Sequence, residues 1–293
     1  MPLRHTLLAT LVAAAWGFNF VVIHIGIGDF PPLLFSALRF TLAAVPLIFF
    51  VRKPDVPWSI ILGIGGMLGV VKFSLLFIGM DTGLSAGLAS LVLQTQAFFT
   101  IILAALLLGE RPTGGQLAGM FVAFLGIALV ASTVGGDLSA LGFALAIAAA
   151  LAWACSNLIM KKAGPVDMLS LLVWVSVIPP IPLFALSFMF EGQEAITAAF
   201  LNLRLEGVGA TVYIAFVATI FGFAVWGKLI NLYGAGKVAP YSLLVPIFGM
   251  TFSALLLGEE FGPLRLLAAA LVITGLAINQ MSGRNPTALK PAE

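Results

Sequence analysis

Long apolar stretches separated by short polar connectors constrain this chain more than any other feature of its sequence. Each stretch is close to the roughly 20 apolar residues that a helix needs to cross a bilayer. Only 9% of the 293 residues are charged, which is too few to cover a water-soluble protein of this size. The sequence therefore predicts an all-α integral membrane protein with ten transmembrane helices. We predict them at residues 6–27, 33–51, 59–80, 84–108, 115–134, 140–160, 168–190, 208–232, 238–258 and 263–281.

Lysine and arginine predict the orientation of these helices, because basic residues favour the cytoplasmic side of short loops. If the N-terminus is inside, the inner connectors and termini hold nine of them, whereas the outer connectors hold only Arg204 and Arg265. We therefore expect a multi-pass protein of the inner (cytoplasmic) membrane with both termini in the cytoplasm. Residues 282–293 then form a cytoplasmic tail.

The stretch Leu-Leu-Leu-Gly-Glu occurs twice, ending at Glu110 and at Glu259, so the copies are 259 − 110 = 149 residues apart. Other residues match at this offset without a gap, for example Gly126 and Gly275. A second copy that begins after five crossings enters the membrane from the opposite face. We therefore expect two inverted five-helix repeats, at residues 6–134 and 138–281, around a central cavity. Glu110 and Glu259 would then lie on opposite sides of the membrane. Inverted repeats are a common plan of secondary transporters.

Lys72 is the most informative charged residue, because it lies deep in the third predicted helix, where a charge is costly unless it faces a cavity or a partner. It could bind a substrate carboxylate, or it could reach the interface or a helix terminus. His24, toward the outer end of the first helix, is a candidate proton relay together with Lys72, or a histidine that is merely hydrogen-bonded near the interface. Arg39, expected nearer the outer third of the second helix, has a structural role or pairs with Asp29 or Asp81.

Uncharged polar and aromatic residues within the spans supply further candidates. Trp16 and Asn19 share one face of the first helix, and Trp153 and Ser156 share one face of the sixth. These four residues would surround one pocket if the halves face a common axis, or they would hold neighbouring helices together. The candidate substrate-binding residues are Trp16, Asn19, Lys72, Gln94, Gln96, Trp153, Ser156, Asn157, Trp174, Tyr213, Trp226 and Tyr241.

Prolines interrupt three of the predicted helices, and Pro46 lies in the second of the ten. Pro179, Pro180 and Pro182 lie within the seventh helix and Pro246 lies within the ninth. A proline lacks the backbone N–H and clashes with the preceding turn, so we predict bends at these positions and treat the four residues in the seventh and ninth helices as candidate hinges.

Several classes of function are excluded by what the sequence lacks. All twelve acidic residues occupy connectors or helix ends, which leaves no carboxylate at mid-membrane for a proton or sodium site. Two histidines and one cysteine do not make a metal cluster, and no phosphate-binding loop of the Walker type is present. We expect no enzyme activity, cofactor, metal or nucleic-acid partner. The expected partners are a small-molecule substrate and membrane lipid, and the oligomeric state stays open, with a monomer compatible with the sequence.

These features resemble the drug/metabolite transporter superfamily, EamA type. The resemblance covers about residues 6–281 and rests on the two five-helix halves, Trp16-Gly17-Phe18-Asn19-Phe20, residues 37–40 and residues 238–259. Length and aromatic content are most similar to the YddG-type exporters of aromatic amino acids. The family often has a proline midway along both the fourth and ninth helices, but here Pro246 is matched by Ala97.

The resemblance implies a secondary transporter that exports small amphipathic metabolites by alternating access. Aromatic or large neutral amino acids are the expected substrates, and the absence of mid-membrane acids favours an uncoupled facilitator. A proton-coupled drug or metabolite exporter, a lipid scramblase and a non-catalytic membrane scaffold are the alternatives.

Overall fold

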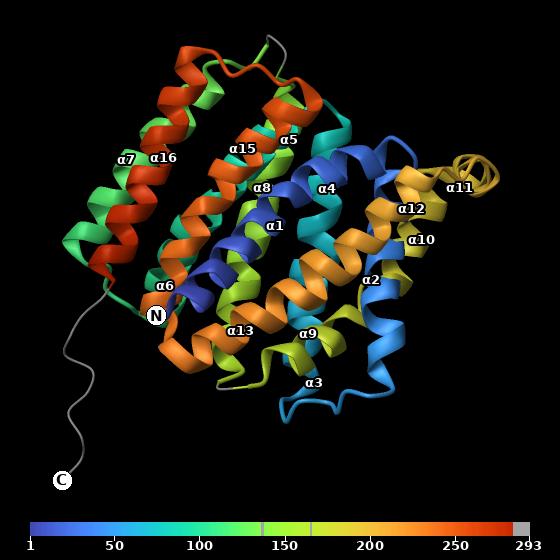
Figure 1. The fold of residues 1–293 in the computed structure, drawn as a ribbon, viewed down its shortest axis with the longest axis horizontal. Coiled ribbons are helices and arrows are strands. Elements are labelled where there is room, and N and C mark those ends of the chain that lie inside the picture. Colours follow the sequence, from blue (N-terminus) through green and yellow to red (C-terminus); the bar gives the residue numbers. More distant parts are fainter. Residues whose placement is uncertain (136–137, 165, 284–293) are drawn as a thin grey trace.

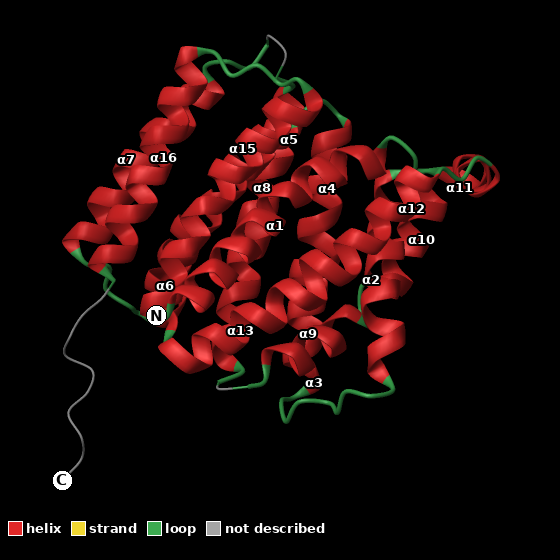
Figure 2. Cartoon of the chain, in the orientation of Figure 1, coloured by secondary structure: helices red, strands yellow, loops and turns green. Residues whose placement is uncertain are grey.

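The computed structural model describes residues 1–135, 138–164 and 166–283, and within these ranges the chain forms helices and no strand (Figures 1 and 2). Nine helices in the described part of the chain are long and apolar enough to cross a membrane, and a shorter apolar helix of 17 residues, α2, lies between the first two of them. The predicted all-helical membrane protein is thereby confirmed. Residues 284–293 of the predicted tail lie outside the described residues.

Five spans are single continuous helices whose ends lie within three residues of the predicted bounds. Turn and cap chemistry sets these ends: Pro31 precedes the second span and Pro32 is its first residue, for example, and a capping box formed by Thr113 and Gln116 starts the fifth. The continuous helices are α1 (Leu3–Ile27), α2 (Pro32–Ile48), α7 (Gly114–Ala131), α8 (Ala140–Lys162) and α16 (Pro263–Ser282).

The other five spans change helix type or break partway along. Segments η1 and η3 are π-helical, and η2 and η4 are 3-10 helices. In chain order these spans are α3 (Trp58–Ile64), η1 (Gly65–Lys72) and α4 (Phe73–Asp81); α5 (Ala86–Val92), η2 (Leu93–Thr95) and α6 (Gln96–Leu108); α9 (Met168–Ser176) and α10 (Pro180–Phe190); α12 (Leu205–Val212), η3 (Tyr213–Phe221) and α13 (Gly222–Tyr233); and α14 (Ala235–Val238), η4 (Ala239–Leu243) and α15 (Leu244–Leu257).

The prolines explain one of these breaks. The seventh span is interrupted between Ser176 and Pro180, and Pro182 lies in the first turn of the helix that follows, where a missing N–H costs little. Pro246 likewise lies in the first turn of α15, directly after the 3-10 segment η4. The backbone therefore changes direction or type near each proline group.

Matching breaks occur at matching positions in the two halves of the chain. A π-helical segment lies in the third and eighth spans, and a 3-10 segment lies in the fourth and ninth. Gly109 and Gly258 end α6 and α15 in the left-handed conformation, with φ of 68° and 69°. The N–H of the glutamate that follows, Glu110 or Glu259, donates to a carbonyl oxygen six residues back at 3.3 Å in both cases. The repeated sequence thus forms the same local structure twice.

Helices α7 and α16 lie side by side at one edge of the molecule (Figure 1). Glycine allows this close contact, because a Cβ at Gly119 would lie 2.5 Å from the carbonyl oxygen of Gly275, and one at Gly126 would lie 2.7 Å from that of Ala268. We call the end of the bundle that holds the start of α1 and the end of α16 the terminal end, and the other end the opposite end.

The connector predicted at residues 191–207 contains one additional helix, α11 (Gly192–Leu201). It follows α10 at the opposite end and stands at the margin of the molecule (Figure 1). Its ten residues are too few to cross a bilayer.

Candidate functional site

Five aromatic or polar side chains from five different spans lie near the middle of those spans. They are Trp16 of α1, Arg39 of α2, Lys72 of η1, Trp153 of α8 and Thr219 of η3. Each lies within three residues of the midpoint of its span, which is about 4.5 Å at a rise of 1.5 Å per residue. We call these five residues the mid-depth group. Arg39 lies at the centre of α2, so its expected position nearer the outer third of the helix is wrong.

Two cations of the mid-depth group stack on the same aromatic ring. The centroid of the Phe73 ring lies 3.9 Å from the guanidinium carbon of Arg39 and 3.3 Å from Nζ of Lys72. Nζ of Lys72 is also 4.9 Å from the ring centroid of Trp153. Arg39 and Lys72 are 4% and 5% exposed, and neither has an acidic side chain within ion-pair distance in the part of the chain that the structure describes.

Aromatic rings alone do not offset the burial of two charges. A cation–π contact contributes about 0.5–2 kcal/mol, whereas burying an ion costs several kcal/mol even after the protein relaxes. A guanidinium group keeps its charge in proteins. The arrangement is therefore suited to receive an anionic group, which the described part of the chain does not provide.

Arg39 connects the two halves of the chain through a hydrogen bond. Its Nη2 donates to Oγ1 of Thr219 at 2.9 Å, and the Thr219 hydroxyl donates to the carbonyl oxygen of Ile214 at 2.8 Å, within the π-helical segment η3. Nε and Nη1 of Arg39 are buried without a hydrogen-bond partner among the described residues. The alternative pairing with Asp29 is wrong, because Asp29 pairs with Arg204 instead. Arg39 therefore retains donors that the protein does not use.

The two tryptophans of the mid-depth group each lie against one of the π-helical segments. Nε1 of Trp16 donates to the carbonyl oxygen of Ala218 in η3 at 2.8 Å, and its ring lies 5.0 Å from that of Trp226. Trp153 faces Lys72, the last residue of η1. Because π-helical turns are uncommon and often mark functional sites, their recurrence beside both tryptophans supports a functional role for this region.

A polar hollow lies between the mid-depth group and the terminal end. Nδ2 of Asn157 in α8 donates to Oε1 of Gln96 at 2.8 Å and to Oγ1 of Thr100 at 3.1 Å. Toward the end of the same helix, Lys161 pairs with Glu110. Because these two side chains are about half exposed, the hollow reaches the surface. It has a volume of about 150 Å³ and is lined by Thr100, Ile101, Ala104, Glu110, Arg111, Pro112, Gln116, Asn157, Leu158 and Lys161.

Carboxylates hold helices together at the opposite end. The two oxygens of Glu259 accept from the N–H groups of Ala86 and Gly87, at the start of α5, at 2.7 and 3.0 Å. Glu191 accepts from two N–H groups at the start of α2, at 2.6 and 3.1 Å. A carboxylate at a helix N-terminus satisfies unpaired N–H groups and interacts favourably with the helix dipole. These contacts tie the two halves of the chain to each other at this end.

Three of the other polar candidates, Asn19, Ser156 and His24, lie on helices that also hold a residue of the mid-depth group. The fourth, Gln94, lies in η2. Asn19 is half-buried on α1, and its Oδ1 has no hydrogen-bond partner among the described residues. Oγ of Ser156 donates to the backbone of its own helix, and Gln94 is half-buried in η2. His24 is exposed near the last turn of α1, whereas Lys72 lies at mid-depth.

The remaining aromatic candidates are spread along the bundle. The hydroxyl of Tyr213, at the start of η3, donates to the carbonyl oxygen of Ala15 at 2.9 Å. The hydroxyl of Tyr241 donates to Oγ1 of Thr6 at 3.5 Å, near the terminal end of α1. Nε1 of Trp174 donates to a carbonyl oxygen in the connector after α2 at 3.1 Å. Tyr241 and Trp174 therefore lie closer to the terminal end than the mid-depth group.

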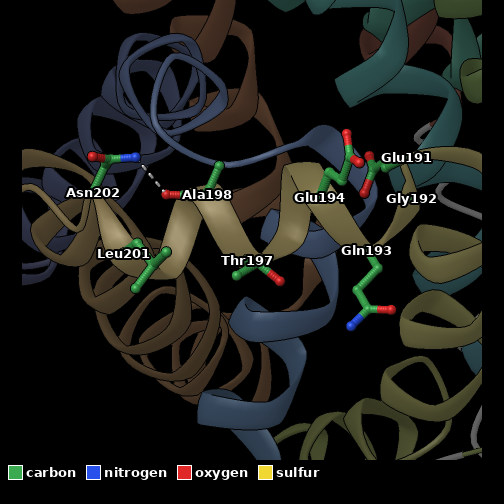
Figure 3. Close-up of a pocket in the computed structure, with 8 residues that line it drawn as sticks. All are labelled: Glu191, Gly192, Gln193, Glu194, Thr197, Ala198, Leu201 and Asn202. Carbon is green, nitrogen blue, oxygen red and sulfur yellow. Dashed lines mark hydrogen bonds between the residues drawn. The ribbon is translucent and has the colours of Figure 1, made fainter.

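An open hollow of about 810 Å³ lies beside α11 (Figure 3). All eight lining residues fall between Glu191 and Asn202, and the amide of Asn202 donates to the carbonyl oxygen of Ala198 within the same helix at 2.9 Å. A surface provided by one marginal helix is poorly suited to enclose a ligand. We therefore place the candidate site at the mid-depth group.

Apolar spans that surround buried polar and charged side chains are typical of a multi-pass membrane protein. No group of three His, Cys, Asp or Glu side chains in the described ranges could hold a metal ion. The chain belongs to the EamA-like transporter family, whose profile matches residues 4–132 and again residues 140–281. The predicted family and the expectation of a transporter, not an enzyme, are thereby confirmed.

Relatives that are named as exporters or efflux pumps cover nearly the whole chain. A probable amino-acid metabolite efflux pump of Escherichia coli (strain K12) is 43% identical and covers 99% of both chains, and one of Salmonella typhimurium is 42% identical and covers 95% of both. A probable terminal-alkyne amino-acid exporter of Streptantibioticus cattleyicolor is 26% identical over 96% of this chain and 95% of its own. A protein solved by crystallography shares the fold, with a TM-score of 0.61, 19% identity and coverage of 96% and 99%.

Proposed function

We propose that this protein exports small amphipathic metabolites of the amino-acid class, in particular aromatic or large neutral amino acids. The observation that carries the proposal is the mid-depth group. It combines Arg39 and Lys72, which have no acidic partner among the described residues, with the aromatic rings of Trp16 and Trp153. The cations suit a substrate carboxylate and the rings suit an apolar side chain. The names of the two relatives above 40% identity support this substrate class.

The proposed mechanism is alternating access between two inverted five-helix halves, residues 6–134 and 138–281. Three observations support it: the family profile matches twice, the π-helical and 3-10 segments recur, and the contacts of Glu110 and Glu259 fall at opposite ends of the bundle. The lysine and arginine distribution supports an inner-membrane protein with its terminal end in the cytoplasm.

On this orientation, we assign the structure to a state that is closed toward the outside. Glu259 and Glu191 hold the outer ends of α5 and α2, while the hollow beside Asn157 reaches the cytoplasmic surface. To release substrate outward, Glu259 leaves the start of α5. Glu110, its counterpart in the repeated sequence, then leaves Lys161 and holds the inner end closed.

The proposed carrier works as a facilitator that follows the gradient of its substrate. All described acidic residues occupy connectors or helix ends, so a carboxylate of the kind that many proton- or sodium-coupled carriers use is not found at mid-depth in the described spans. A proton-coupled carrier would depend on His24 or Lys72. Dependence of the initial rate on an imposed pH gradient separates the two mechanisms, because a facilitator moves its substrate without a proton and is insensitive to that gradient.

Flux into proteoliposomes tests the proposed function. We expect the protein to move labelled aromatic and large neutral amino acids or closely related carboxylates, and Lys72→Ala to lower the initial rate at least tenfold. Lys162→Ala, which removes an exposed lysine at the terminal end, is the matched control and should leave the rate unchanged. Rates no higher than in protein-free liposomes for the whole panel would refute the proposal.

A further inference from the structure

We propose that the mid-depth site prefers a carboxylate whose molecule carries no ammonium group, such as an N-acylated amino acid, over a zwitterionic amino acid. The proposal rests on the export function proposed above and narrows the substrate class of the same site.

Charge is unbalanced within the spans. Arg39 and Lys72 are buried at mid-depth, while each of the ten described acidic residues lies in a connector, in the short external helix α11, or in the first or last turn of a helix. A bound monoanion lowers the local sum from two positive charges to one. A zwitterion brings no net charge and leaves the sum at two, so charge balance favours the monoanion.

Hydrogen-bonding capacity near these cations also favours a carboxylate. Nε and Nη1 of Arg39 are buried without a hydrogen-bond partner among the described residues, and so is the hydroxyl of Ser36, which lies one turn away on the same face of α2. Nζ of Lys72 lies over the rings of Phe73 and Trp153. These groups are donors or hydroxyls, which a carboxylate oxygen can use fully. The unpartnered acceptor on α1, Oδ1 of Asn19, is neutral.

In this structure both cations lie over the ring of Phe73, whose face carries a partial negative charge. A bound carboxylate would replace the ring as the negative partner of the cations. In an α-amino acid the ammonium group is attached next to the carboxylate, so binding the carboxylate there brings the ammonium close to Arg39 and Lys72. In a buried site this repulsion is weakly screened. An acylated nitrogen is uncharged and escapes the repulsion, while the carboxylate and the apolar side chain stay the same.

A matched set of three compounds tests the preference with the full chain in proteoliposomes at neutral pH. N-acetyl-L-phenylalanine carries only the carboxylate, L-phenylalanine carries both charges, and phenethylamine carries only the ammonium. We expect kcat/KM for N-acetyl-L-phenylalanine to exceed that for L-phenylalanine at least tenfold, and no phenethylamine flux above protein-free liposomes. Arg39→Gln should remove most of this advantage, and Arg39→Lys should restore part of it. Arg52→Gln, an exposed site with the same change of charge, should keep the advantage.

Ligand-dependent thermal stability of the wild-type protein gives a second measurement that does not depend on the folding of the variants. N-acetyl-L-phenylalanine should raise the melting temperature more than L-phenylalanine at equal concentration. An equal rise with sodium phosphate at matched ionic strength would assign the cations to an inorganic anion and overturn the proposal. If L-phenylalanine is transported as efficiently as its acetyl derivative, the preference is refuted and the export function stands. If none of the compounds is transported and the wider panel also fails, both are refuted.

Discussion

The contact between Glu259 and the start of α5 makes a measurable prediction about the opposite end of the bundle. Its carboxylate accepts two hydrogen bonds, from Ala86 and Gly87, and lies at the positive end of a helix. Glu259→Gln keeps the size of the side chain, removes the charge and leaves one neutral oxygen as acceptor. We expect the first turn of α5 to open more often in this variant.

The size of the effect follows from the hydrogen bonds that change. A hydrogen bond to a charged group contributes about 1.5–3 kcal/mol, and a neutral one contributes about 1 kcal/mol. The exchange of two charged bonds for one neutral bond therefore costs about 2–5 kcal/mol. Glu259 is partly exposed, so solvent screening favours the lower end of this range. A loss of about 2 kcal/mol corresponds to a roughly 30-fold larger opening equilibrium.

Amide hydrogen exchange reports this opening directly, because the two N–H groups that Glu259 binds exchange only when they are released. We expect roughly 30-fold faster exchange of Ala86 and Gly87 in Glu259→Gln, about the factor derived from the lost bonds. The control is Glu260→Gln, which makes the same change of charge at the next, exposed residue. Equal exchange rates in wild type and Glu259→Gln, or an equal increase in the control, would refute this account of the contact.

Two further variants test contacts elsewhere in the bundle. In Gly119→Ala the new Cβ would lie 2.5 Å from the carbonyl oxygen of Gly275, so we expect unfolding to become easier by about 1–3 kcal/mol. Gly66→Ala, where a Cβ meets open space, should show no such loss, and equal denaturation midpoints would contradict the prediction. Trp16→Phe removes the hydrogen bond to the Ala218 carbonyl and should cost about 1 kcal/mol of stability and lower the substrate flux. Unchanged stability and flux would show that this bond contributes nothing.

The apolar spans could be predicted from the sequence to within three residues, because the hydrocarbon thickness of a membrane and the local cap residues determine where a helix ends. Thr113 and the prolines at the start of α2, Pro31 and Pro32, are such local signals. The depth of Lys72 could be predicted for the same reason. Features that depend on neighbouring residues in the sequence, such as helix ends and the depth of a side chain, could therefore be predicted from the sequence alone.

Contacts between distant parts of the chain could not be predicted in the same way. The sequence did not indicate that Arg39 shares the Phe73 ring with Lys72 and bonds Thr219, because these residues come from three different spans. Glu191 lies in a connector, and nothing local indicates that it binds the start of α2, more than 150 residues away. The π-helical segments have no compositional signature that separates them from ordinary apolar helix.

The shortness of α2 has a consequence for the lipid around this protein. Its 17 residues extend about 26 Å, less than the roughly 30 Å of a typical hydrocarbon layer. A bilayer can match so short a helix by thinning beside it, which brings headgroups and water closer to the depth at which Arg39 lies. Acyl-chain length thereby becomes a control on this carrier: longer chains raise the energy needed to keep the membrane thin at α2, and shorter ones relieve it.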